Sequence, residues 1–153
     1  MKRILFVCTG NTCRSPMAEA LFRAKANGQG WEVRSAGVAA FDGQPASVHA
    51  IQVLRERGID NEHQSSRLNE ELVNWSDLIL TMTESHKRAV LASFPNARSK
   101  VHTLREFVGV EGCADIADPF GGELEDYRRC AQDIEESLDM LYEQLSKEGF
   151  RDS

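Results

Sequence analysis

A short apolar run that leads directly into a polar loop and then into a helix constrains the fold of this chain most strongly. Residues 4–7 are Ile-Leu-Phe-Val, a combination of branched and aromatic side chains that is typical of a buried strand. Residues 8–15 follow as a polar stretch, and Ser15 and Pro16 suit the N-cap and first position of a helix that extends to about Asn27. The sequence therefore predicts a strand, a tight loop and a helix in immediate succession.

The alternation of strands and helices continues along the chain. We expect further strands at residues 31–36, 77–82 and 100–104, and helices at residues 45–58, 70–75, 83–94 and 124–147. The helix that begins at Pro45 should direct Val48, Ile51, Val53 and Leu54 toward the core. Residues 109–122 are rich in Gly and Asp and should form a long, functional loop. This order predicts one α/β domain, residues 1–153, in which helices cover both faces of a parallel sheet.

The loop of residues 8–15 has the composition of an anion site. Gly10 and Asn11 tolerate left-handed backbone angles best, so they stand where a sharp turn requires them. Such a loop points several N–H groups inward at a helix N-terminus, and this arrangement binds a tetrahedral anion. The loop also follows the carboxyl end of the first strand, where parallel sheets bind ligands. We expect the anion to be surrounded by Thr9, Gly10, Asn11, Thr12, Cys13 and Ser15.

Cys8 and Arg14 stand near the two ends of this loop and supply its chemistry. A thiol beside a helix N-terminus and a fixed cation is favoured as the thiolate, which is the nucleophilic form. The Arg14 guanidinium presents a planar fork of donors that matches two oxygens of a phosphate. Together they predict attack on phosphorus through a cysteinyl-phosphate, a reaction that requires neither a metal nor another cofactor.

A further group must protonate the leaving atom, and a carboxylic acid on a loop can do this and then activate water. Asp118 precedes Pro119 within the long loop. Asp-Pro pairs also form simple turns, and Asp115 and Asp126 are equal candidates on composition. The residues alone therefore leave the acid open among three aspartates.

Composition argues against several other classes of protein. A net charge of −6 disfavours a general binder of nucleic acids or acidic membranes. No apolar run approaches the length of a membrane span and no signal-peptide core precedes the first strand, so we expect a cytoplasmic protein. The 4 cysteines form neither a dense disulfide framework nor a Cys-x-x-Cys pair, which argues against a zinc site. We expect this small acidic domain to be a monomer.

Three stretches resemble the low-molecular-weight protein tyrosine phosphatase family, namely residues 7–20, Ser35-Ala36-Gly37 and Asp118-Pro119. The resemblance runs almost from end to end. It implies a four-stranded parallel sheet in a flavodoxin-like order, with Cys8 as the nucleophile, Arg14 as the phosphate clamp and Asp118 as the general acid and base. It also implies a hydrogen-bond network that holds the loop and the thiolate, made by Asn11, Ser15, Ser35 and His63.

Two positions are similar to the protein arginine phosphatases of Gram-positive bacteria. Thr12 stands where tyrosine-specific enzymes usually carry a bulky aliphatic residue, and Phe120-Gly121 replace the aromatic residues that usually follow Asp-Pro. A guanidinium offers N–H donors to the Thr12 hydroxyl and the Asp118 carboxylate, whereas a phenyl ring would leave that hydroxyl unpaired. We therefore expect a protein-arginine phosphatase that hydrolyses phosphoarginine in phosphorylated proteins.

Three other functions remain open. The same residues support a protein tyrosine phosphatase. An arsenate reductase uses a similar loop but passes electrons to further cysteines, and here only Cys113 or Cys130 could serve, which do not form the close pair that such a relay favours. A phosphoprotein-binding module would bind phosphate without turnover and would need no acid.

Two further expectations concern residues near the loop. Phe41 and Phe120 are candidates for pocket walls that stack on a flat guanidinium or ring, with core packing as the alternative. Cys13 shares the loop with Cys8, so oxidation of the thiolate and capture by Cys13 would give a reversible, redox-sensitive off-switch. The histidines other than His63 give no signal of a role.

Overall fold

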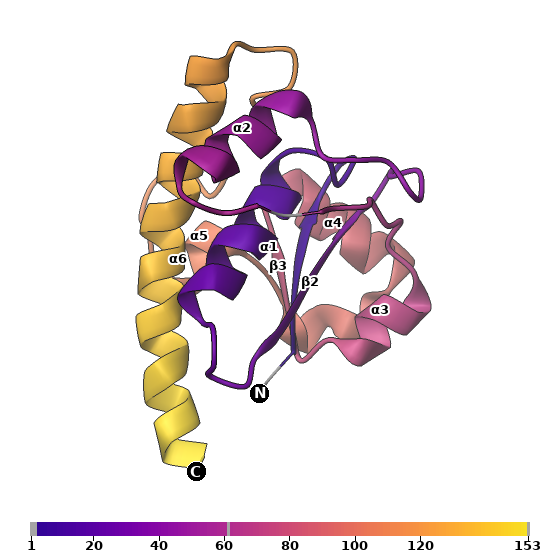
Figure 1. Cartoon of the computed structure of the whole chain (residues 1–153). Coiled ribbons are helices and arrows are strands. Elements are labelled where there is room, and N and C mark those ends of the chain that lie inside the picture. The colour runs from indigo at the N-terminus through magenta and orange to yellow at the C-terminus, as the bar shows by residue number, and fades with distance from the viewer. Residues whose placement is uncertain (1–2, 61, 153) are drawn as a thin grey trace.

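Four parallel strands form the centre of the molecule (Figure 1). They are β1 (Arg3–Cys8), β2 (Glu32–Gly37), β3 (Leu78–Thr81) and β4 (Val101–Thr103), in the order β2-β1-β3-β4. The computed structural model describes residues 3–60 and 62–152, and each strand lies within about one residue of its predicted bounds. Because the strand order reverses at β1, the carboxyl ends of β1 and β3 frame the crevice in which such sheets bind ligands.

Helices cover both faces of this sheet, as the alternation of elements predicts (Figure 1). One face packs against α1 (Arg14–Lys25), α2 (Val48–Glu56), α5 (Leu104–Phe107) and α6 (Leu124–Asp152). The other face packs against α3 (Glu70–Trp75), α4 (Glu84–Ser93) and the short 3₁₀ helix η1 (Pro95–Lys100). The sequence did not predict α5 and η1, which are short helices beside β4.

The two apolar cores follow from the alternation of side chains along each strand. In β1, Ile4 and Phe6 point into the core beneath α1, whereas Leu5 and Val7 point into the core beneath α4. Both sets are buried, as expected for a parallel sheet covered on two sides. The last helix, α6, turns one apolar face to the core, with buried side chains at Tyr127, Ala131, Ile134, Leu138, Leu141 and Leu145.

Two helix starts lie where the sequence predicts them because polar side chains cap them. Asn69 accepts a hydrogen bond from the backbone N–H of Leu72 at the start of α3, and Thr83 accepts one from His86 at the start of α4. The cap on α4 fixes where this helix begins after β3. It therefore places the first turn of α4 at the carboxyl edge of the sheet.

The start of α1 differs from the prediction. The helix begins at Arg14, and its N-cap is Cys13, whose side chain makes no capping bond. Ser15 is therefore not the N-cap, because its hydroxyl turns instead toward Cys8 and Asn11. Pro16 becomes the third helical residue, still within the first turn, where backbone N–H groups have no partner in the helix and the missing N–H of proline is tolerated.

The start of α2 also differs. Ser47 caps this helix through a hydrogen bond from the backbone N–H of Ala50, so the helix begins at Val48 rather than at Pro45. The Val48 side chain is 80% exposed, and the prediction that it points into the core is wrong. Ala50, Val53 and Leu54 form the buried face instead.

The long loop of residues 109–122 returns to the same edge of the sheet. It contains no helix or strand, as predicted, and the backbone N–H of Ile116 donates to the carbonyl of Met82 directly after β3 (2.8 Å). This bond brings a distant segment beside the loop that follows β1. Within the described residues, no helix is both long and apolar enough to cross a lipid bilayer.

Candidate active site

The loop between β1 and α1 surrounds a cavity of about 200 Å³ at the carboxyl edge of the sheet. The residues that line it come from two segments far apart in the sequence, namely Cys8, Thr9, Gly10, Thr12, Cys13, Arg14, Asp118 and Phe120. The structure thus brings the predicted nucleophile, phosphate clamp and acid to one cavity. Asn11 and Ser15 are buried behind the loop rather than in its lining.

Asn11 holds the shape of the loop from behind. Its φ of 57° is left-handed, as predicted, whereas Gly10 does not adopt such an angle. The Asn11 amide donates to Ser15 Oγ (2.8 Å) and Ser35 Oγ (2.9 Å), and His63 Nε2 lies 2.7 Å from the Asn11 carbonyl oxygen. The four residues of the expected network therefore meet at Asn11.

The Cys8 sulfur is buried at the base of the cavity, 2.9 Å from Ser15 Oγ. Because Asn11 already donates to Ser15 Oγ, the Ser15 proton can point at the sulfur, which lies closer than the other acceptor, the Ala36 carbonyl oxygen at 3.5 Å. A hydrogen bond from a hydroxyl stabilises the ionised form of a thiol. The local structure thus favours a nucleophilic sulfur. The described residues contain no group of three or more His, Cys, Asp or Glu arranged to hold a metal ion.

The network extends to a buried carboxylate that the sequence did not indicate. Ser35 Oγ donates to Glu19 on α1, and Glu19 pairs with Arg23 at 2.5 Å. Arg23 also donates to the carbonyl of Val33 in β2 (2.6 Å). Glu19 therefore ties the Asn11 network to both α1 and β2, and the signal available in the sequence was its spacing of four residues from Arg23.

Gly37, at the end of β2, lies against the outside of the loop. A Cβ atom there would come within 2.5 Å of the Thr9 carbonyl oxygen and 2.9 Å of the Asn11 backbone nitrogen. Backbone atoms on both sides cannot move away easily. The close approach also permits the next residues to pair with the loop, since Val38 and Ala39 donate to the carbonyls of Cys8 and Thr9.

We expect Gly37→Ala to lower the free energy of unfolding by about 2 kcal/mol, because the new methyl group overpacks a site bounded by backbone. The displaced loop should also reduce turnover. Urea denaturation checks the stability, with Gly10→Ala as the matched control, since a Cβ at Gly10 meets only Thr12 Oγ1 at an ordinary 3.7 Å. Equal destabilisation of the two variants would contradict the steric argument.

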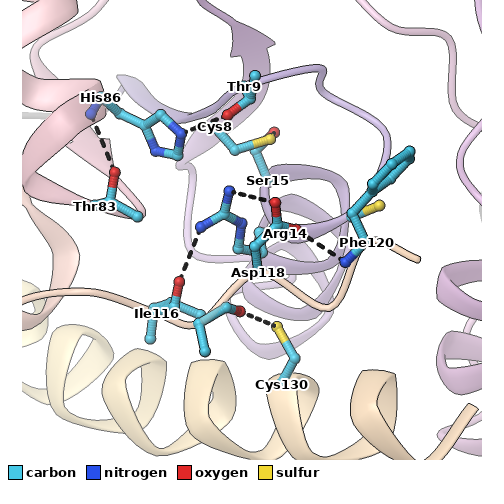
Figure 2. Close-up of polar contacts among 12 residues, drawn as sticks. Cys8, Thr9, Arg14, Ser15, Thr83, His86, Ile116, Asp118, Phe120 and Cys130 are labelled. Carbon is cyan, nitrogen blue, oxygen red and sulfur yellow. Dashed lines mark hydrogen bonds and ion pairs between the residues drawn. The ribbon is translucent and has the colours of Figure 1, made fainter. Parts of the chain in front are cut away.

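Arg14 joins the loop to the segment that carries the acid (Figure 2). Its Nη1 donates to the Ile116 carbonyl (2.9 Å), and its Nη2 lies 3.5 Å from Asp118 Oδ2. The Arg14 side chain is 5% exposed and that of Asp118 is 51% exposed, so the guanidinium lies deep in the cavity and the carboxylate near its mouth. Among the described side chains, Arg14 Nε is a buried donor without an acceptor, as expected of a group that receives an anion.

The structure shows which of the three candidate aspartates lies at the cavity. Asp115 accepts a hydrogen bond from the backbone N–H of Glu84 at the start of α4, and Asp126 accepts one from Glu123 before α6. Both carboxylates therefore stabilise helix starts. Asp118 alone of the three lines the cavity beside Cys8.

Thr12 and Cys13 are held from α2 and α6. The Thr12 carbonyl accepts a hydrogen bond from the Ser47 backbone N–H (2.9 Å), and Cys13 Sγ lies 3.4 Å from the Tyr127 hydroxyl. Burial, together with the contact to Cys13, raises the pKa of Tyr127 to about 12, so its hydroxyl stays protonated. Both cysteines of the predicted redox switch line the cavity and are unpaired, and the switch itself stays a prediction.

His86 is a residue of the site that sequence reasoning missed. Its Nε2 lies 2.8 Å from Thr9 Oγ1, and the side chain is buried beside Arg14 (Figure 2). Burial, and secondly the charge of Arg14, lowers the pKa of His86 to about 4. The available signal was the Thr83 cap, because a helix that follows β3 begins at the same edge as the phosphate loop.

The two candidate aromatic walls have different positions. Phe120 lines the cavity with a side chain that is 77% exposed, and its backbone N–H donates to Asp118 Oδ1 (3.0 Å). Phe41 is 72% exposed and does not line the cavity. It is therefore neither a core residue nor part of this cavity wall. A contact between Phe41 and a larger substrate stays a prediction.

A buried thiol, a ring of loop residues and a deep guanidinium are the parts of a phosphate-transfer site, and comparison with known proteins agrees. Residues 3–151 match the family described as low molecular weight phosphotyrosine protein phosphatase. The chain belongs to this family. It is therefore an enzyme, a cysteine-dependent phosphatase with the expected flavodoxin-like fold.

Similar members of the low molecular weight phosphatase family include arginine phosphatases. A protein-arginine-phosphatase of Geobacillus stearothermophilus is 52% identical over 147 residues, which cover 95% of this chain and 97% of the relative. The solved structure of the YwlE arginine phosphatase from Geobacillus stearothermophilus has a TM-score of 0.94 at 49% identity and covers 99% of this chain and 97% of that one. A YwlE Cys-to-Ser mutant with a phosphorylated active-site serine has a TM-score of 0.91 at 46% identity, over 95% of this chain and 96% of that one.

Proposed function

We propose that this protein is a protein-arginine phosphatase, which hydrolyses the P–N bond of phosphoarginine in other proteins. The observation that carries the proposal is the lining of the cavity, because Thr12 and Asp118 share it with Cys8 and Arg14. The Thr12 hydroxyl oxygen and a carboxyl oxygen of Asp118 can both accept hydrogen bonds from a guanidinium. The relatives that are described as arginine phosphatases support the same substrate.

In the first step, the Cys8 sulfur attacks the phosphorus atom of the substrate. The S–P bond forms as the P–N bond breaks, and Asp118 gives its proton to the departing guanidine nitrogen. Arg14 and the backbone N–H groups of the loop stabilise the equatorial oxygens, on which negative charge accumulates. The buried network around Asn11 keeps these donors in place before the substrate arrives.

In the second step, water hydrolyses the cysteinyl-phosphate. The Asp118 carboxylate accepts a proton from the water as the oxygen attacks phosphorus, and the S–P bond breaks to release inorganic phosphate. Cys8 leaves as a thiolate, which the Ser15 hydroxyl stabilises. The structure of the YwlE Cys-to-Ser mutant, in which the active-site serine is phosphorylated, supports an intermediate of this kind.

The experiment that tests the substrate is a comparison of turnover on phosphoarginine and phosphotyrosine peptides of the same sequence. We expect Thr12→Ile to shift the ratio of kcat/KM toward phosphotyrosine by about tenfold or more, because the variant loses an acceptor for guanidinium N–H groups and gains an apolar wall. Steady-state release of phosphate from both peptides gives the ratio.

Thr12→Ser is the matched control for this prediction, since it keeps the hydroxyl and should keep the preference for phosphoarginine. An unchanged ratio in Thr12→Ile would remove Thr12 as the selector. If the wild-type protein hydrolysed only the phosphotyrosine peptide, phosphoarginine would be rejected as the substrate. The family description makes a tyrosine phosphatase the second candidate.

An electron relay of the arsenate reductase type has less support. Cys130 is buried on α6, and burial raises its pKa to about 12, so it is a poor source of thiolate at neutral pH. Cys113 is exposed on the long loop and does not line the cavity. The raised pKa of Cys130 and the position of Cys113 outside the cavity make both cysteines poor candidates for a chain of disulfides that starts at Cys8.

We also propose that the enzyme acts as a monomer in the cytoplasm on phosphorylated protein substrates. The four cysteines are unpaired, which fits a reducing compartment. The acidic net charge of −6 makes nucleic acid an unsuitable partner. Gel filtration with light scattering tests the monomer directly.

A further inference from the structure

His86 is the third residue of α4 and points from the start of this helix toward the phosphate loop (Figure 2). Its backbone N–H donates to Thr83 Oγ1 (3.1 Å), which fixes the first turn of the helix. The residue is 5% exposed, and its Nε2 lies 2.8 Å from Thr9 Oγ1. The contact joins residues 77 positions apart in the chain.

The environment keeps this imidazole neutral. Burial opposes its charged form most strongly, and the Arg14 cation opposes it further. The start of a helix also disfavours a cation, because the backbone N–H groups there carry partial positive charge. Asp118 and Asp115 oppose these effects only in part. A neutral ring bonds Thr9 in either tautomer, since a hydroxyl can donate or accept.

Several parts of the fold hold the phosphate loop in place. The Asn11 side is fixed by Ser35 of β2 and by His63. The Thr12 and Cys13 side is fixed by the start of α2 and by α6. The side chain of Thr9 is fixed from α4 by His86. Thr9 directly follows the nucleophile, so this contact holds the side chain of the residue next to Cys8.

We propose that His86 is a positioning residue for the reaction: it holds Thr9 and thereby sets how the first part of the loop receives the phosphate. The proposal rests on the proposed function in one respect, that the loop binds the substrate phosphate. His86 does not touch the reacting atoms and acts through Thr9. Its contribution is preorganisation of the loop, which a preformed anion site requires.

The test is a double-mutant cycle with two substitutions, His86→Phe and Thr9→Val. Phenylalanine keeps a flat ring without a nitrogen, and valine keeps the shape of threonine without a hydroxyl. We expect His86→Phe to lower kcat/KM for a phosphoarginine peptide about tenfold and to weaken binding of inorganic phosphate, as measured by calorimetry. In the Thr9→Val background the same substitution should change either quantity less than about twofold.

Two further variants make the result specific. His86→Gln offers an amide near the position of Nε2 and should recover most of the loss, which a purely steric role would not allow. His102→Phe changes a histidine that lies outside the cavity and should leave kcat/KM unchanged. Thermal unfolding of each variant separates stability from loop geometry.

Additive effects in the cycle, or a His86→Gln variant as impaired as His86→Phe, would overturn the proposal. The measurement of inorganic phosphate binding tests the role of His86 whichever substrate the enzyme uses. Coupling between His86 and Thr9 in phosphate binding, together with no turnover of phosphoarginine by the wild-type protein, would support the positioning role and reject the proposed substrate.

Discussion

Cys8→Ser should lower kcat on a phosphoarginine peptide roughly ten-thousandfold or more, because a hydroxyl replaces the buried sulfur that attacks phosphorus. The sulfur lies at the base of the cavity, and the Ser15 hydroxyl is its hydrogen-bond partner at 2.9 Å. A serine oxygen in the same place remains protonated at neutral pH and is a far weaker nucleophile. Colorimetric measurement of released phosphate gives the rate.

Cys113→Ser is the matched control, because this thiol is exposed on the long loop and should leave kcat unchanged. Binding of inorganic phosphate should persist in Cys8→Ser, since Arg14 and the loop remain. If Cys8→Ser still binds phosphate but does not turn over, the loss of activity arises in the chemical step and not in binding. A variant that keeps wild-type activity would show that Cys8 is not the nucleophile.

The phosphate loop could be predicted from the sequence because its shape depends on local chemistry. A buried strand must end, a helix must begin, and a left-handed residue must join them, so Asn11 was placed correctly before any long-range contact was known. The helix starts at Asn69 and Thr83 were equally accessible, since a cap bonds a backbone N–H only a few positions away. Sequence patterns succeed where the interaction is short in chain separation.

The remaining features of the site depend on contacts that no local pattern encodes. Ser15 has the chemistry of a helix cap, yet its hydroxyl serves the thiol, because Asn11 and Cys8 compete for it more effectively. Glu19 meets Ser35, and His86 meets Thr9, only after β2 and α4 reach the carboxyl edge of the sheet. Tertiary topology therefore decides which polar residues become part of the site.

Composition could not distinguish Asp118 from Asp115 and Asp126, because only the tertiary structure brings Asp118 to the cavity. We expect Asp118→Asn to lower kcat on phosphoarginine about a hundredfold to ten-thousandfold, because an amide can neither protonate the leaving nitrogen nor activate water. Asp126→Asn is the matched control, since an asparagine there can still accept the bond from the Glu123 N–H. Its kcat should stay within about twofold of wild type.

The size of the loss should depend on the leaving group. An aryl phosphate such as p-nitrophenyl phosphate releases a stable anion that needs no proton, so Asp118→Asn should slow its first step far less than it slows cleavage of the P–N bond. Rapid-quench measurement of the first turnover on each substrate isolates that step. An equal loss on both substrates would mean that Asp118 binds or orients the substrate, through its position 3.5 Å from Arg14, rather than acting as the acid. A much larger loss on phosphoarginine than on p-nitrophenyl phosphate would show that Asp118 protonates the leaving nitrogen.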